Sequence, residues 1–188
     1  MKQELEEQLY KKYPKLFAEA GLSPTQSCMA FGIECADGWF SILQRMCGII
    51  QHHIKETRKN SAVIRRYNRA LKQAINGNDK NLRFYYGNRL GWNDEKVDEF
   101  VKRDLENKSF REEYSKPPTQ LVFTQIKEKF GTLRIYYSGG DEFCCGVISM
   151  AESMSAVTCE ECGLPGKVHE GAWIRTQCDK CAESRGKK

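Results

Sequence analysis

The sequence predicts an α+β protein in which a long buried helix packs on a small antiparallel sheet, with a helical middle insertion and a C-terminal zinc ribbon. Three observations lead to this prediction: a wide apolar stripe along residues 38–57, an alternating apolar pattern that turns back on itself at 121–137, and two Cys-x2-Cys pairs near the C-terminus. A helix with so wide a stripe is buried on most of its circumference. Alternation is typical of strands with one buried face.

Five segments are expected along the chain. They are an N-terminal part of the core at 1–57, a helical insertion at 58–118, a hairpin and helix that complete the core at 119–157, a zinc ribbon at 158–184, and a basic tail at 185–188.

The N-terminal segment is expected to hold two short helices and a strand. Apolar side chains recur at a helical spacing in the first 13 residues, and a second helix, begun by a proline, is expected to end at Gly21. A short strand at 31–35 follows, and Asp37 is a candidate cap for the long helix.

Two further helices are expected in the insertion. Ser61 is a candidate cap for a helix that ends near Ile75, and Asn93 or Asp94 for the other. The inner face of that second helix is predicted to consist of Val97, Phe100, Val101 and Leu105. The core then resumes with strands at 121–129 and 133–137. A final helix at 142–155 is predicted to bury Val147, Met150, Ala151 and Met154.

Composition limits the classes of protein that fit the chain. A net charge of +5 on 188 residues is mildly basic, which is compatible with nucleic acid but too weak to indicate it alone. The N-terminus lacks the apolar stretch of a signal peptide, and no apolar run is long enough to cross a membrane. Nine cysteines without an export signal indicate reduced thiols and metal ligands. We therefore expect a cytoplasmic protein without a membrane partner.

The clearest motif is a set of four cysteines at the spacing of a zinc site. Cys159 and Cys162 form one pair, Cys178 and Cys181 the other, and 15 residues separate the pairs. Four thiolates saturate a tetrahedral zinc ion, so the pattern predicts one structural zinc. Two disulfides or free thiols are the alternative, and the absence of any sign of an oxidising compartment disfavours it.

Two groups of cations are candidates for binding nucleic acid or a partner. Arg65, Arg69 and Lys72 recur on one helix face, and the hairpin cations lie near Tyr136 and Tyr137. A row of cations can follow phosphates, and tyrosines can stack on bases. The alternative is an ordinary solvated surface. The full set consists of Arg65, Arg66, Arg69, Lys72, Lys127, Lys129 and Arg134.

Other chemistries are weaker predictions. A metal-dependent phosphodiesterase would need convergence of Glu34, Asp37, Glu128 and Glu152, each of which also has a structural explanation. A second metal or thiol site could use Cys28, Cys35, Cys47, His52 and His53, but buried core thiols are favoured, and one of Cys144 and Cys145 is expected to be buried. An inhibitor of a host defence protein could use the charged faces of the insertion. Since no nucleotide-binding loop or hydrolase motif is present, we expect a non-catalytic protein.

Several blocks together resemble a family of small proteins encoded by tailed phages and prophages. The blocks are residues 31–39 (FGIECADGW), 127–136 (KEKFGTLRIY), 151–155 (AESMS), and the four cysteines with Pro165-Gly166 and Trp173. They cover the first and last thirds of the chain and leave 58–118 as its variable part. The resemblance implies a phage accessory product inside an infected bacterium. By association it favours contact with nucleic-acid machinery or with host defences.

Overall fold

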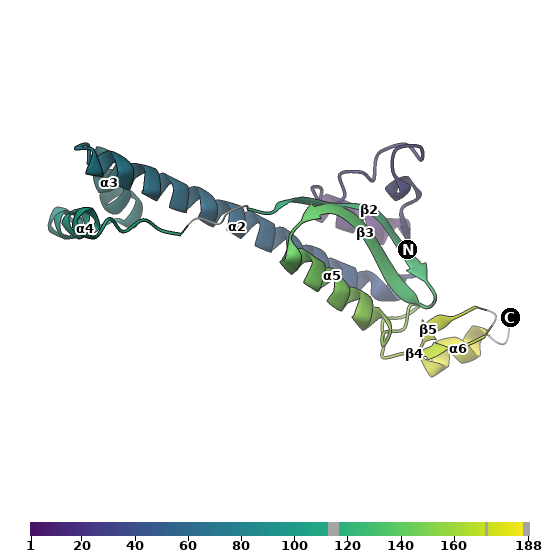
Figure 1. The fold of residues 1–188 in the computed structure, drawn as a ribbon. Coiled ribbons are helices and arrows are strands. Elements are labelled where there is room, and N and C mark those ends of the chain that lie inside the picture. The colour runs from purple at the N-terminus through teal and green to yellow at the C-terminus, as the bar shows by residue number, and fades with distance from the viewer. Residues whose placement is uncertain (113–116, 172, 186–188) are drawn as a thin grey trace. The chain divides into compact units, whose positions relative to one another are not determined.

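The fold is taken from a computed structural model that describes residues 1–112, 117–171 and 173–185 (Figure 1). The chain mixes helices with small sheets, which confirms the predicted α+β class. It divides into two compact units: unit 1 consists of Met1–Ile54 and Pro118–Lys188, and unit 2 of Lys55–Pro117. Of the basic tail expected at 185–188, Arg185 ends a helix and 186–188 lie outside the described residues.

Helix α2 runs without a break from Phe40 to Ile75, and supplies residues to both units. The prediction of two helices divided near Ser61 was therefore wrong. The Ser61 hydroxyl donates to the Thr57 carbonyl one turn earlier at 2.8 Å, a bond that a serine inside a helix can make as readily as it caps one. Residues 58–60 contain no glycine or proline to interrupt the helix.

Unit 1 contains a three-stranded sheet flanked by helices. Its elements, besides α2, are α1 (Gln3–Lys12), β1 (Ile33–Glu34), β2 (Thr119–Lys129), β3 (Thr132–Gly140), α5 (Glu142–Ser155), β4 (Lys167–His169), β5 (Arg175–Gln177) and α6 (Asp179–Arg185), with short 3-10 turns at Cys28–Phe31 and Asp37–Trp39. Residues 14–21 form successive turns and not the second helix that was expected.

The sheet has the order β1-β2-β3 and is mixed. β2 and β3 form the predicted antiparallel hairpin, with Ile126 opposite Ile135 and Lys127 opposite Arg134. β1 pairs in parallel with β2, placing Ile33 beside Ile126, so the sheet is not wholly antiparallel as predicted. Parallel neighbours require a long crossover, which the 84 residues from 35 to 118 supply and which no local pattern reveals.

One hydrophobic core joins α2, the sheet and α5 in unit 1. The α2 side chains within it confirm the predicted buried helix, and Cys35 and Cys47 are buried thiols, as favoured. On α5 the buried face consists of Cys144, Ile148, Ala151 and Ser155. The prediction for this helix was wrong at Met150 and Met154, which are 61% and 46% exposed, because the face that packs against the core is a neighbouring one with less apolar side chains at three of its four positions.

Unit 2 is a smaller helical assembly with its own aromatic core. It contains the rest of α2, α3 (Lys80–Phe84), a π-helical turn at Tyr85–Arg89, and α4 (Asp94–Asn107). As predicted, Asn93 caps α4, through a 3.1 Å hydrogen bond from the Lys96 N–H. Of the four residues predicted on the inner face of α4, Val97 and Val101 are buried, and Phe100 and Leu105 pack partly buried against them.

A buried carboxylate, Asp104, lies at the centre of unit 2. It accepts hydrogen bonds from the hydroxyls of Tyr67 and Tyr86, and Arg103 forms an ion pair with it at 2.9 Å. Burial alone would raise the pKa of Asp104, but these donors outweigh burial and lower that pKa below its ordinary value. The carboxylate is therefore ionised at neutral pH and fixes the two tyrosines.

We expect Asp104→Asn to lower the free energy of unfolding of unit 2 by about 1–3 kcal/mol at neutral pH, because two buried tyrosine hydroxyls lose a charged acceptor. The folded-state pKa lies below the unfolded value of about 3.9, so this contribution is present above that pH and disappears as the pH falls through the folded-state pKa. The free energy of unfolding of the variant should therefore decrease less than that of the wild type as the pH is lowered into the acid range.

Hydrogen exchange of α4 amides measures both effects. The matched control is Asp98→Asn, whose carboxylate is exposed and ion-paired with Arg83, and it should change stability by less than about 1 kcal/mol. Equal effects of the two substitutions would contradict the assigned role of Asp104.

Candidate metal centre

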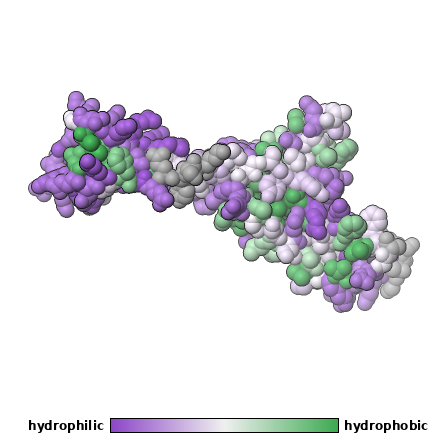
Figure 2. All heavy atoms as spheres, in the orientation of Figure 1, coloured by the Kyte–Doolittle hydropathy of each residue, from purple (hydrophilic) through white to green (hydrophobic). Residues whose placement is uncertain are grey.

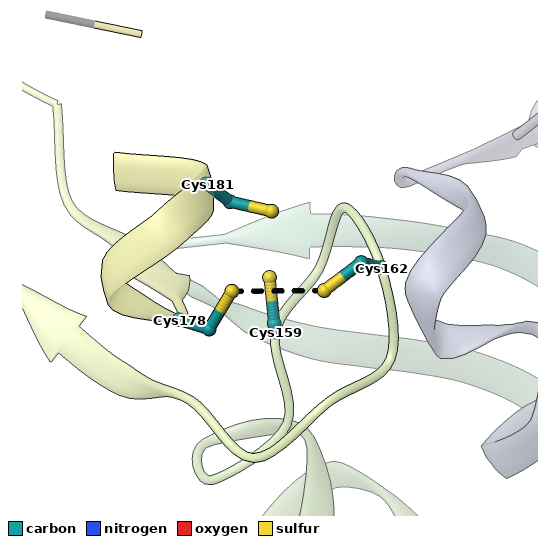
Figure 3. A group of neighbouring side chains, drawn as sticks. All are labelled: Cys159, Cys162, Cys178 and Cys181. Atoms are coloured by element: carbon teal, nitrogen blue, oxygen red, sulfur yellow. Dashed lines mark hydrogen bonds between the residues drawn. The ribbon is translucent and has the colours of Figure 1, made fainter. Parts of the chain in front are cut away.

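The four predicted cysteines converge on one point (Figure 3). Cys159 and Cys162 lie in the turn after α5, Cys178 follows β5 directly, and Cys181 lies on α6. Their four sulfurs lie within 4.8 Å of one another, and the Cys162 and Cys178 sulfurs are 3.7 Å apart. The two pairs thus form one cluster.

The geometry of this cluster fits a metal ion better than disulfides. A tetrahedral ion with metal–sulfur bonds of about 2.3 Å places its ligand sulfurs about 3.8 Å apart, close to the observed separation. A disulfide would require about 2.05 Å. All nine cysteines of the chain are free. The cluster could therefore hold one metal ion.

The first pair is held by a tight turn. The Cys159 N–H donates to the Leu164 carbonyl at 2.7 Å, and the Gly163 N–H donates to the Cys159 carbonyl at 2.9 Å. Gly163 has a φ of +76°, a conformation that glycine adopts at little cost. The two-stranded β4–β5 ribbon then leads to the second pair. His169 is not part of the cluster, and its Nε2 lies 3.1 Å from the Gln177 carbonyl oxygen.

The backbone around the cluster favours a thiolate. Burial raises the pKa of the Cys159 thiol, but the N–H groups of Cys178 and Cys162 hydrogen-bond to its sulfur and bring that pKa down to about 7. A metal ligand must be deprotonated, so Cys159 can supply a thiolate at neutral pH.

The first cysteine pair is attached to the start of the long helix. The Gly38 N–H donates to the Glu160 carbonyl at 2.7 Å, and the Trp39 indole donates to the Thr158 carbonyl at 2.8 Å. A Cβ at Gly38 would lie 2.5 Å from both the Glu160 carbonyl oxygen and the Gly163 nitrogen. Only glycine allows this approach, so the Asp-Gly-Trp block has a structural role beside the cysteine cluster.

The Glu160 side chain reinforces the same contact. Its Oε1 accepts a hydrogen bond from the Ala36 N–H at 3.1 Å, while Oε2 is buried without a partner among the described residues. Burial raises the pKa of this carboxyl above its ordinary value.

The tip of the β2–β3 hairpin holds the module from a second direction. The Thr176 hydroxyl on β5 donates to the Gly131 carbonyl at 2.6 Å, and the Glu160 N–H donates to the Thr176 carbonyl at 2.9 Å. Gly131 has a φ of +78° and lies against Ile174 and Arg175. The Phe-Gly-Thr block is therefore also explained by attachment of the cysteine module.

The four candidate catalytic carboxylates do not form a cluster among the described residues. Asp37 accepts from the Lys2 N–H and forms an ion pair with Lys2, and does not cap the helix through its side chain as was expected. Glu128 accepts from the Gly131 N–H at 2.6 Å, and Glu152 accepts from the Ile135 N–H at 2.8 Å. Glu34 accepts from Gln125 on the sheet. Each carboxylate thus has a separate structural partner.

Two of the four basic residues predicted on α2 line an open pocket of about 380 Å³ in unit 2. Arg66 and Arg69 line it, together with Arg89 and the exposed ring of Phe84. Arg65 and Lys72 are also exposed, but they are not among its lining residues. Arg89 could not have been selected from sequence, because it reaches the pocket through an irregular π-helical turn that follows Phe84, the last residue of α3.

The predicted hairpin cations lie on the face of the sheet opposite the core. Lys127 and Arg134 are direct cross-strand partners, and the Lys127 ammonium lies 5.4 Å from the ring of Tyr136. Lys129 follows on the same strand face and lies over Phe130. Tyr137 packs partly buried against the core, so only one of the two tyrosines accompanies the cations.

The remaining candidate thiols and His52 differ in their exposure to solvent. Cys28, Cys145 and His52 are exposed, whereas Cys144 is buried. This confirms that one member of the adjacent cysteine pair is buried.

Comparisons with protein-family models, with curated proteins and with solved structures find no match to this chain. Among the described residues, no helix combines the length and apolar character needed to span a membrane.

We expect Gly38→Ala to destabilise unit 1 by about 1–3 kcal/mol, because the added methyl group must displace the backbone of the first cysteine turn. Proteolysis of residues 158–181 should accelerate, and the melting temperature should fall. The control is Gly146→Ala on α5, where the methyl group meets no atom and should stabilise by about 0.5–1 kcal/mol. Equal melting temperatures for the two variants would show that the module does not depend on this contact.

Proposed function

We propose that the protein is a non-catalytic, zinc-stabilised binding protein that contacts nucleic acid, alone or within a nucleic-acid-handling host complex. The resemblance of its sequence blocks to phage and prophage proteins supports an accessory role in the cytoplasm of an infected bacterium. The observation that carries the proposal is the arginine-lined pocket of unit 2.

The composition of this pocket suits a phosphate backbone. Three guanidinium groups line it, and no carboxylate from the described residues does. Arginine donates paired hydrogen bonds in a fixed plane, which matches phosphate oxygens. Two polar lining side chains are held in place, since the Asn81 amide donates to Gln73 at 2.7 Å. Phe84 is 62% exposed and could stack on a base.

The pocket arginines also differ from two other arginines of unit 2, Arg83 and Arg103. Arg83 forms ion pairs with Asp79 and Asp98, and Arg103 with Asp104. In contrast, Arg66, Arg69 and Arg89 form no ion pair within the described part of the chain. Figure 2 shows the surface of unit 2 as predominantly hydrophilic on the face drawn. Unpaired cations around a concavity favour an anionic ligand over a merely solvated surface.

The hairpin cations support the same interpretation more weakly. Lys127 and Arg134 are like charges directly opposite each other, an arrangement that costs stability in a sheet. Glu34 lies beside Lys127 on the neighbouring strand and offsets part of that charge. We therefore assign the hairpin a secondary role in binding.

We further propose that the four cysteines bind one structural zinc as a zinc ribbon. Thiolate ligands in a tetrahedral arrangement favour zinc among common divalent ions. With four protein ligands, the ion has no position for a substrate. Cys162→Ser should lower the zinc content by one ion per chain and expose residues 158–181 to proteolysis. Cys28→Ser, at an exposed free thiol, should do neither.

An inhibitor that binds a host defence protein is the second candidate, and one feature of α5 favours it. Phe143, Met150, Met154 and Val157 recur at helical spacing and are 46–63% exposed. Such an apolar stripe is more typical of a protein-binding face than of a nucleic-acid contact.

Fluorescence anisotropy tests the nucleic-acid proposal. Zinc-loaded protein is titrated with labelled single- and double-stranded DNA and RNA at two salt concentrations. We expect Arg66/Arg69/Arg89→Ala to weaken binding at least tenfold and to reduce the dependence of binding on salt, because three phosphate contacts are removed. Arg65/Lys72→Ala measures what the rest of the predicted α2 row contributes.

The charge-matched control is Lys11/Lys15/Lys55→Ala, which removes three exposed cations outside the pocket. It should retain more affinity than the pocket variant. Equal losses of affinity in the two triple variants would show that binding depends on net charge and not on the pocket. The inhibitor proposal would be supported by two results together. The protein would bind none of the nucleic acids, and it would recover a single host protein after nuclease treatment, which the Met150→Asp variant would not recover.

A further inference from the structure

Unit 1 contains a second group of potential metal ligands that shares no residue with the four-cysteine cluster. His53 lies on α2, Asp141 caps α5, and Cys144 lies in the first turn of α5. One imidazole nitrogen, one carboxylate oxygen and one sulfur from these residues lie within 4.8 Å of one another. Segments 88 residues apart in the chain thus bring three different donor types together.

Asp141 orients the other two members of the group. Its Oδ1 accepts the Cys144 N–H at 3.1 Å, which caps the helix, and its Oδ2 lies 2.8 Å from His53 Nε2. Capping the helix requires only the first of these contacts. The second oxygen is thus directed toward the imidazole, and an ion bound to both atoms would replace the proton of this hydrogen bond and move them slightly apart.

Packing fixes both remaining donors before any ion binds. The His53 ring stacks on Phe143 with 4.2 Å between ring centroids, which restricts the direction of Nε2. Cys144 is fully buried, and a Cβ at Gly140 would lie 3.5 Å from its sulfur, so the end of β3 passes close to the thiol. The side chains of His53 and Asp141 are 23% and 34% exposed, which leaves a path from solvent.

We propose that His53, Asp141 and Cys144 form a second metal site, which binds one Zn²⁺ and leaves a fourth coordination position open to solvent. Nitrogen and sulfur donors select zinc over magnesium or calcium, which prefer oxygen ligands. Three protein ligands with one open position define the zinc class that binds water or a small anionic ligand. The site is independent of the nucleic-acid proposal.

Zinc content per chain tests this site directly. Protein equilibrated with zinc and freed of loosely bound metal is analysed by native mass spectrometry and elemental analysis. We expect two ions in the wild-type chain, and one in His53→Ala, Asp141→Asn and Cys144→Ala. Asparagine caps helices as well as aspartate does, so Asp141→Asn removes a ligand without removing the cap.

Adjacent residues supply matched controls. His52→Ala and Cys145→Ala alter the neighbouring histidine and cysteine, both exposed, and should retain two ions. Replacement of zinc by cobalt adds a spectroscopic test. The difference between the wild-type and Asp141→Asn absorption spectra reports the cobalt ion of the second site. This ion should show less sulfur-to-metal charge-transfer absorption than the cobalt ion of the four-thiolate cluster, because only one of its ligands is sulfur.

One ion in the wild-type chain would overturn the proposal, as would two ions retained in both His53→Ala and Asp141→Asn. If Cys144→Ala unfolds because its thiol is buried in the core, the other two variants still decide the question, and circular dichroism verifies their folding. Loss of the second ion in the His52→Ala control would place the site elsewhere.

Discussion

The structure of unit 1 depends on the close approach of the first cysteine turn to the backbone at Gly38. The start of the long helix and the first half of the four-cysteine cluster share this contact, so neither can shift without the other. The buried indole of Trp39 donates to the last residue before the cysteines, and Glu160 bonds to Ala36 through its side chain. A small module with few apolar side chains is thereby held on the core through hydrogen bonds, which the contact with the hairpin tip supplements.

The spacing of residues in the sequence was sufficient to predict those features that depend only on residues close together in the chain. The four cysteines, the hairpin and the buried helix were predicted because each requires only its own periodicity or a fixed interval. The parallel pairing of Ile33 with Ile126 was not predicted, since it joins segments whose relation depends on the whole crossover. Helix α2 was divided wrongly near Ser61 because a serine that caps and a serine that bonds back within a helix have the same sequence signal.

The candidate sites show more clearly the same difference between features set by local spacing and features set by the whole fold. The cysteine cluster is encoded by two short intervals, whereas Asp104 is acidic in a helix whose other acidic residues are solvated, and nothing nearby marks it as buried. His53 and Cys144 were considered separately, and only the fold adds Asp141 to them. Arg66 and Arg69 were selected from a charge row, but their pocket partner Arg89 depends on a π-helical turn that propensity does not predict.

The fit of glycine at positions 38 and 131 also has a consequence for comparing sequences. Two blocks far apart in the chain, around Asp-Gly-Trp and Phe-Gly-Thr, contact the cysteine module from two directions, and at each contact a side chain larger than that of glycine would meet neighbouring atoms. The two glycines and the cysteines should therefore be inherited together. A chain that carries four cysteines at this spacing but a larger residue at either glycine would have to attach its cysteine module differently.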